Sequence, residues 1–155
     1  MEWMLLPYRR YFEFSGRSSR REYWMFTLFM FLVYVVLGGI VAAQLPWQDI
    51  LEHKATGAAI MASVMVRPGI LVPAGLLMLF GAGSFIPAIA VAVRRFHDQN
   101  LTGWLVLVFA VLQQLPYIGK VLPMVQLVMM ARKGNVGGNK YGADPLDPSY
   151  AGVFA

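Results

Sequence analysis

The chain has 155 residues, of which 58% are hydrophobic and 14% charged, and its mean hydropathy is +0.57. These values lie outside the range of ordinary soluble domains and indicate one domain embedded in a lipid bilayer. The formal charge of +5 does not indicate nucleic-acid binding, because the basic residues flank apolar segments and form no continuous stripe. Orientation in the membrane and attraction to anionic lipids explain these charges better.

The chain contains no cysteine, which excludes disulfides, thiolate catalysis and cysteine metal sites. Its two histidines, His53 and His97, are too few for a typical zinc site. We therefore expect no metal and no other cofactor.

Residues 1–22 are expected to lie at the cytoplasmic membrane surface. The first residues mix aromatic and aliphatic side chains with Arg9 and Arg10, which is typical of an interfacial segment, and Pro7 argues against one unbroken helix. Ser19 and Glu22 fit a capping box immediately before an apolar run. We therefore expect the first spanning helix to begin near Arg20, with no cleavable signal ahead of it.

Two uncharged runs, 23–43 and 69–93, are each long enough to cross the roughly 30 Å hydrocarbon core as helices. The more polar segment between them, 44–68, is expected to form an external loop with a surface helix. Small residues in the two runs suit close helix packing within one chain or between copies, which leaves a homo-oligomer open. These residues are Gly38, Ala42, Gly81 and Gly83.

The third apolar region, 104–131, contains one charge, Lys120, and is interrupted by Pro116, Gly119 and Pro123. Either one long kinked helix or two short helices would fit. The positive-inside rule favours a hairpin, because a hairpin keeps the loop at 94–103 and the tail at 132–155 on the cytoplasmic side with the N-terminus. We therefore predict an all-α integral membrane protein with two full spans and a C-terminal helical hairpin, four helices in total, and both termini in the cytoplasm.

Three short motifs occur in order along the chain: FSGRSSRREYW at 14–24, RRFHDQNLTGW at 94–104 and GGNKYGADP at 137–145. Together they resemble a bacterial inner-membrane family called domain of unknown function 805. The resemblance implies a small multi-pass protein of the inner membrane. It implies no biochemical activity, because the role of the family is unassigned.

The second motif groups two arginines, a histidine and an aspartate between two apolar runs. As plain structure, its arginines orient the preceding span, Asp98 pairs with an arginine, and His97 donates to a carbonyl or a phosphate. Asp144 in the third motif would neutralise an arginine and tie the tail to the loop. In that interpretation the three motifs form one structural clasp, to which we assign Ser19, Glu22, Asp98 and Asp144.

The functional interpretation places the basic residues of the first two motifs around an anion. Guanidinium groups bind phosphate and carboxylate bidentately, and an anionic lipid headgroup is the nearest candidate ligand. The residues proposed for this cup are Arg17, Arg20, Arg21, Arg94, Arg95 and His97. The expected function is a non-enzymatic interaction or anionic-lipid-contacting module.

Two alternatives remain open. A headgroup-modifying enzyme would use His97 as a general base oriented by Asp98, although no serine, second carboxylate or metal set completes such a site. A small transporter or channel subunit would need polar residues within its spans, and the chain offers mainly Lys120. At the tip of a hairpin, Lys120 would instead reach the outer headgroups by snorkelling.

Overall fold

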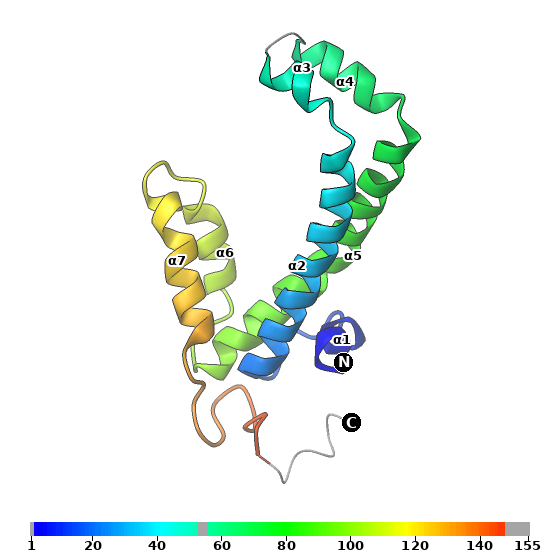
Figure 1. The fold of residues 1–155 in the computed structure, drawn as a ribbon. Coiled ribbons are helices and arrows are strands. Elements are labelled where there is room, and N and C mark those ends of the chain that lie inside the picture. Colours follow the sequence, from blue (N-terminus) through cyan, green and yellow to red (C-terminus); the bar gives the residue numbers. More distant parts are fainter. Residues whose placement is uncertain (1, 53–55, 148–155) are drawn as a thin grey trace. The chain divides into compact units, whose positions relative to one another are not determined.

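The computed structural model describes residues 2–52 and 56–147, without the side chains of Asp49 and Ser63. Seven helices form within these ranges, and the only β contact there is an isolated bridge between Asn139 and Gly142 (Figure 1). The all-helical prediction is confirmed. The chain divides into two compact units, one of residues 1–28 with 85–155 and one of residues 29–84.

Helices α2 (Arg20–Ala43) and α5 (Pro68–Asp98) are long and apolar enough to cross a membrane. Only 6% of the most apolar window of α2 and 28% of that of α5 is buried within the protein, so most of the apolar surface faces outward. A helix with this pattern is stable in lipid because its backbone hydrogen bonds are all internal. Both helices match the runs that the sequence predicts as spans.

Helix α5 extends further than expected. The loop predicted over residues 94–103 is shorter, because the helix continues through Asp98 and places Arg94 and Arg95 in its final turns. The helix ends where Asn100 adopts a φ of 60° and the chain turns back, with Leu101 N donating to Phe96 O. The sequence from 94 to 98 contains no glycine or proline that would end it earlier.

Residues 44–68 contain two short helices, α3 (Trp47–Leu51) and α4 (Gly57–Met65), where we expected one surface helix. His53 and Lys54 of this segment lie outside the described residues. The ends of the segment are tied together, because the Gln44 side chain donates to Gly69 O at 2.5 Å and Arg67 donates to Gln44 O at 3.1 Å. A side chain at Gly69 would overlap the Gln44 amide and displace it from this contact.

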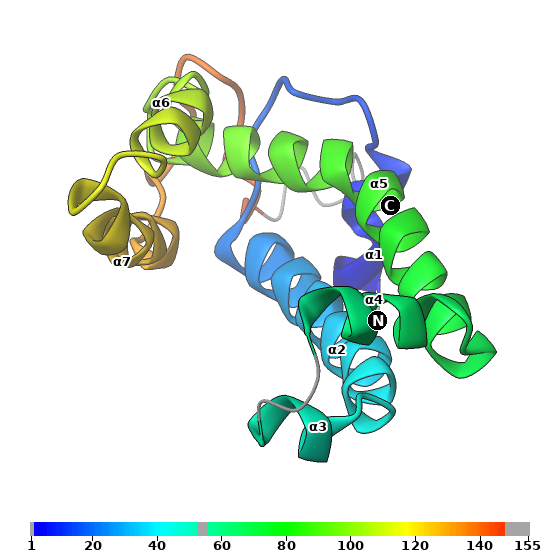
Figure 2. The same cartoon turned by 90° about the horizontal axis from the view of Figure 1, so that it is seen from above.

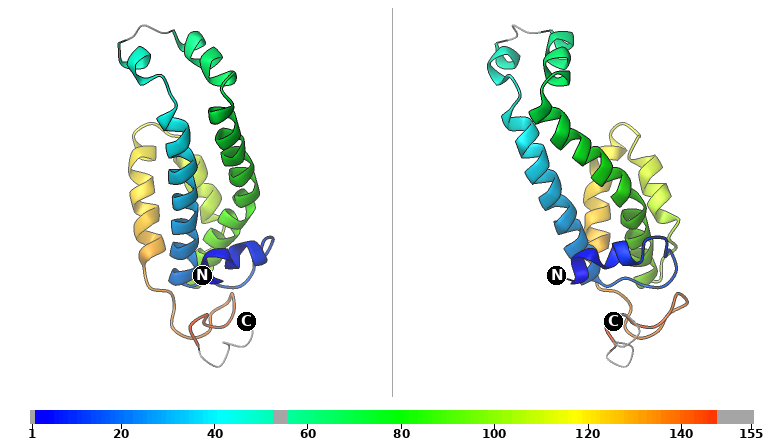
Figure 3. Two further views of the ribbon diagram at one scale, coloured as in Figure 1. Left: turned by 45° about the vertical axis from the view of Figure 1, so that its right-hand side comes forward. Right: turned by 90° about the vertical axis from the view of Figure 1, so that its right-hand side faces the viewer.

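Residues 104–131 form a hairpin and not one long helix. Helix α6 (Leu105–Leu112) and helix α7 (Ile118–Ala131) lie side by side in Figure 1, and both views of Figure 3 show the turn that joins them at one end. A turn with Tyr117 at a φ of 69° joins them, and Gln113 of one arm donates to Gln126 of the other at 2.7 Å. Lys120 is exposed in the first turn of α7, next to this turn.

Helix α1 (Glu2–Arg9) corrects the expectation for the N-terminal segment, because it continues through Pro7. Proline removes one backbone hydrogen bond from a helix. Here the Pro7 side chain is fully buried, and burial of the ring offsets the lost bond. The helix also packs Tyr8 against Phe26 of α2, with ring centroids 5.5 Å apart.

The end of α5 lies beside the hairpin (Figure 2). Phe96 of α5, Phe109 of α6 and Met130 of α7 form a buried hydrophobic cluster, in which the two phenyl rings stack with centroids 6.0 Å apart. This contact fixes the last turn of α5 relative to the two arms of the hairpin.

Candidate functional site

The three motifs meet at the C-terminal end of α5. The last carbonyl groups of a helix have no partner within it and need donors from elsewhere. Asn135 N donates to Asp98 O at 2.8 Å, and the Asn139 side chain donates to His97 O at 2.9 Å, so the tail after α7 caps α5. The segment before α2 contacts the helix slightly earlier, where Ser18 N donates to Arg94 O at 3.1 Å.

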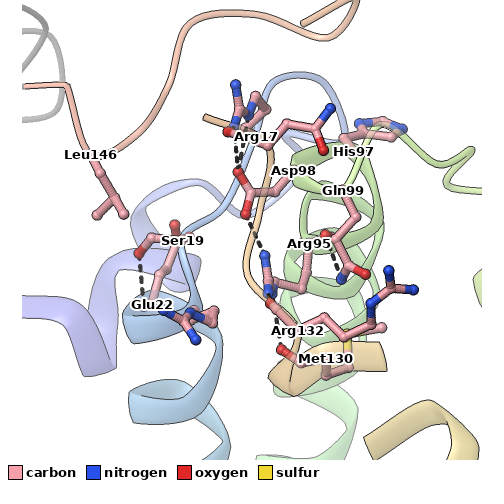
Figure 4. Close-up of polar contacts among 12 residues, drawn as sticks. Arg17, Ser19, Glu22, Arg95, His97, Asp98, Gln99, Met130, Arg132 and Leu146 are labelled. Atoms are coloured by element: carbon pink, nitrogen blue, oxygen red, sulfur yellow. Dashed lines mark hydrogen bonds and ion pairs between the residues drawn. The ribbon is translucent and has the colours of Figure 1, made fainter. Parts of the chain in front are cut away.

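Arg17 and Asp98 form the central ion pair (Figure 4). Nε and Nη2 of Arg17 donate to the same carboxylate oxygen at 3.0 and 2.9 Å. Its remaining hydrogen bonds go to the tail, to Gly137 O at 2.6 Å and Asn135 O at 2.5 Å. The Arg17 side chain is only 1% exposed, so this guanidinium is occupied by the protein itself.

Arg95 binds the other oxygen of Asp98 and also caps the end of α7. Its Nε donates to Met130 O at 3.1 Å, and Nη2 donates to Arg132 O. Gln99 adds a bond to Met129 O at 2.8 Å. A cation at the C-terminus of a helix is favourable because the helix dipole is negative there.

Arg94 pairs with Glu22 at 2.9 Å and also donates to Glu13 O at 2.9 Å. Only half of the predicted capping box forms. Ser19 Oγ accepts from Glu22 N at 3.2 Å, but the Glu22 carboxylate binds Arg94 and does not return to the Ser19 backbone. The buried arginine outcompetes a backbone amide because its positive charge strengthens the hydrogen bond.

We call these five residues the charge cluster: Arg17, Glu22, Arg94, Arg95 and Asp98. All are at most 4% exposed. Two carboxylates face three guanidinium groups, and Asp144 stands 4.0 Å from Arg17 as a third acid. Three members of the predicted anion cup therefore carry internal partners and do not face an open space.

Asp144 folds the tail. Its two carboxylate oxygens accept from the backbone amides of Gly137 and Leu146, both at 3.0 Å. Gly134 lies directly against Asp98, where an added Cβ would overlap the carboxylate. The tail can approach the end of α5 this closely only with glycine at position 134.

His97 does not contact Asp98 through its ring. Its Nδ1 lies 3.1 Å from Gly16 O, and its ring stacks on Tyr141 with centroids 3.8 Å apart. Because Asp98 binds the two arginines, the pair required for a general base oriented by Asp98 is not formed. The imidazole instead joins the first motif to the third.

Two residues of the predicted cup, Arg20 and Arg21, are exposed and line a cavity of about 450 Å³. Lys133 provides a third cation there, and none of the three forms an ion pair with any residue that the structure describes. We call this space the basic cavity. It is further lined by Ser19, Asp98, Asp144 and the tail residues Gly134, Asn135, Val136, Pro145 and Leu146.

Several residues of this region escape a sequence-based search. Asn135 and Asn139 cap α5, Gln99 caps α7, and Tyr141 stacks on His97. Asn139 and Tyr141 lie within the third motif, which is the only signal that could have identified them. Within residues 2–52 and 56–147, no group of three or more histidine or acidic side chains could hold a metal ion.

Comparison with known proteins identifies the family of the chain. A family model described as "Protein of unknown function (DUF805)" matches residues 11–143. The chain is 34% identical over 148 residues to the Escherichia coli inner membrane protein YhaI, covering 94% of this chain and 96% of the relative. It is also 34% identical over 149 residues to the E. coli inner membrane protein YhaH, covering 96% and 100%. No solved structure gave a significant match.

Proposed function

The chain belongs to the DUF805 family of membrane proteins, and we propose that it is a non-enzymatic module of the inner membrane that binds anionic lipid headgroups at its cytoplasmic face. In this proposal the basic cavity receives the phosphate of the headgroup. The charge cluster holds the walls of the cavity in place.

The proposed topology rests on contacts between the chain segments. Ser18, just before α2, contacts Arg94 near the end of α5, so the chain leaves and returns to one side between them. Asn135, just after α7, contacts Asp98, which means that the hairpin also returns to that side. The same side carries most of the basic residues, and these favour the cytoplasm. Both described ends of the chain are therefore cytoplasmic in this proposal.

The proposal of lipid binding rests on one observation: Arg20, Arg21 and Lys133 line one cavity, and none of them has an acidic partner among the residues that the structure describes. The two carboxylates in the lining do not cancel this charge. Asp98 is matched by Arg17 and Arg95, and Asp144 by backbone amides and by Arg17. Basic pockets beside spanning helices on the cytoplasmic side are typical sites for anionic headgroups.

The first turn of α2 adds to the attraction. Arg20 and Arg21 are the first two residues of this 24-residue helix, and amides at a helix N-terminus favour an anion. Ser19 already accepts from Glu22 N, which is the third amide of the turn. A phosphate at this position would meet both the helix dipole and the three cationic side chains.

Native mass spectrometry of the protein with bound lipid tests the proposal. The test variant replaces Arg20, Arg21 and Lys133 with glutamine, and the control variant replaces the exposed Arg9, Arg132 and Lys140 in the same way. We expect phosphatidylglycerol to remain on the unmodified protein and on the control variant, and to be lost from the test variant. Equal loss from both variants would contradict the proposal, because the attraction would then depend on total charge alone.

A further inference from the structure

A second cavity, also of about 450 Å³, lies on another part of the same unit. Its walls are mostly aliphatic and aromatic side chains of α5, the start of α6 and the segment around Trp104. We call it the apolar cavity. Its volume and apolar lining are typical of a site for a small ligand, and such sites usually contain a few polar groups that orient the ligand.

His97 provides one of these polar groups, and its hydrogen-bonding role is fixed by its surroundings. The Gly16 carbonyl can only accept a hydrogen bond, so Nδ1 carries the proton in the neutral ring. Nε2 is therefore an acceptor, and it has no partner among the residues that the structure describes. The stacked Tyr141 holds the plane of the ring.

Gly103 keeps the space beside this acceptor free. An added Cβ at Gly103 would lie 3.0 Å from Nε2 and 2.5 Å from a methyl group of Val93. All three residues line the apolar cavity. A ligand atom can therefore reach Nε2 only because position 103 carries no side chain.

Thr102 is the second polar group of the lining. Its Oγ1 accepts a weak bond from Trp104 N at 3.4 Å, which leaves the hydroxyl proton available to donate. The cavity thus offers one acceptor on His97 and one donor on Thr102. A ligand hydroxyl can donate to Nε2 or accept from the Thr102 hydroxyl, so it suits either polar group of the lining.

We propose that the apolar cavity binds a neutral lipid with a long hydrocarbon chain and a hydroxyl headgroup. None of the described lining residues is Arg, Lys, Asp or Glu, so a carboxylate or phosphate headgroup would lose its hydration without a counter-ion. An ester or quinone carbonyl can accept from Thr102 but has no proton to donate, so it would leave the Nε2 acceptor unpaired. A hydroxyl avoids both costs. The hydrocarbon chain would contact Ile89 and Leu107 of the spanning region.

Equilibrium binding of radiolabelled cis-9-octadecen-1-ol to the full-length protein in a non-ionic detergent tests the proposal. The comparison ligands are the methyl ether of this alcohol and cis-9-octadecenoic acid. We expect the alcohol to bind at least tenfold more tightly than either, because the ether lacks the donor and the acid carries a charge. Equal affinity for the alcohol and the ether, tighter binding of the acid, or no binding of the alcohol would overturn the proposal.

Two sets of variants locate the site. In His97→Phe a flat ring remains against Tyr141 but the acceptor is removed, so the affinity for the alcohol should fall to that for the ether. Leu107→Trp fills the apolar cavity and should abolish binding, whereas Val108→Trp, on the neighbouring exposed position of α6, should leave binding unchanged. If His97→Phe does not fold, the comparison of Leu107→Trp with Val108→Trp still tests where the ligand binds. Equal affinities of these two variants would contradict the assignment.

Discussion

Arg17 and Asp98 are 81 positions apart in the sequence, yet the arginine donates two hydrogen bonds to a single oxygen of the aspartate at 3.0 and 2.9 Å. Their side chains are 1% and 6% exposed. The pair joins the segment before the first long helix to the end of the second one. The same arginine binds two carbonyl groups of the tail, so one side chain connects all three motifs.

Replacing Asp98 with asparagine should lower the free energy of unfolding by about 3–5 kcal/mol, because two buried guanidinium groups would lose their shared counter-ion. Unfolding of the detergent-solubilised protein with increasing SDS measures this change. Glu13→Gln is the control, since its ion pair with Arg10 is 44% exposed on the acid side and should contribute no more than about 1 kcal/mol. Similar losses in the two variants would contradict the buried pair.

Gly134→Ala should destabilise the protein by about 1–3 kcal/mol, because the new methyl group overlaps the Asp98 carboxylate and forces the tail away. Gly138→Ala is the matched control in the same tail. A Cβ there would meet only Gly142 O at 3.8 Å, an ordinary contact. The same SDS titration checks both variants. A neutral effect of Gly134→Ala would mean that the tail does not pack on α5.

The hairpin should depend on the bond between Gln113 and Gln126. Replacing either residue with leucine should cost about 1–2 kcal/mol, since the remaining amide loses its partner in an apolar setting. Replacing both should be less harmful than the sum of the single changes, which a double-mutant cycle measures. Gln114→Leu is the control, because within the described part of the chain the only hydrogen bond of that side chain goes to Ala110 O of its own helix, at 3.4 Å. Additive effects at 113 and 126 would rule out the bond.

Glu13 lies outside the spanning helices, and its carboxylate makes the stability of the fold depend on pH. The hydrogen bond from Arg10 holds the pKa of Glu13 below its ordinary value of 4.5. Because the folded pKa is depressed, its contribution to stability is present above about pH 4.5 and is lost as the pH falls through the lower folded value. Carboxyl NMR should show the pKa of Glu13 rising toward 4.5 in Arg10→Gln. An unchanged titration would mean that the bond is absent in solution.

The sequence was sufficient to predict the helical fold because its signals are local. The uncharged runs at 23–43 and 69–93 correspond to α2 and α5, and the interruptions around Pro116 mark the turn of the hairpin. Two expectations about where helices end were wrong. Pro7 did not end α1, because its burial offsets the missing amide, and α5 continued past residue 93 in the absence of any breaker.

The pairing within the charge cluster could not be predicted in this way. A local rule assigns Glu22 to the Ser19 backbone, but the carboxylate binds Arg94, 72 positions away. The asparagines that cap α5 follow no periodic pattern either, since they reach the helix only after the hairpin has returned the tail to it. An arginine that is buried pairs within the protein, and one that is exposed is accessible to a ligand. Which of the two applies depends on these long-range contacts.

The most direct test of the central claim is a dipolar coupling measurement between the phosphorus of bound phosphatidylglycerol and the ¹⁵N-labelled arginine side chains of the membrane-reconstituted protein. We expect a strong coupling to guanidinium nitrogens that disappears when Arg20 and Arg21 are replaced with lysine, since these are the two arginines among the described residues that line the basic cavity. A coupling that persists in this variant would place the phosphate on other arginines and contradict the account.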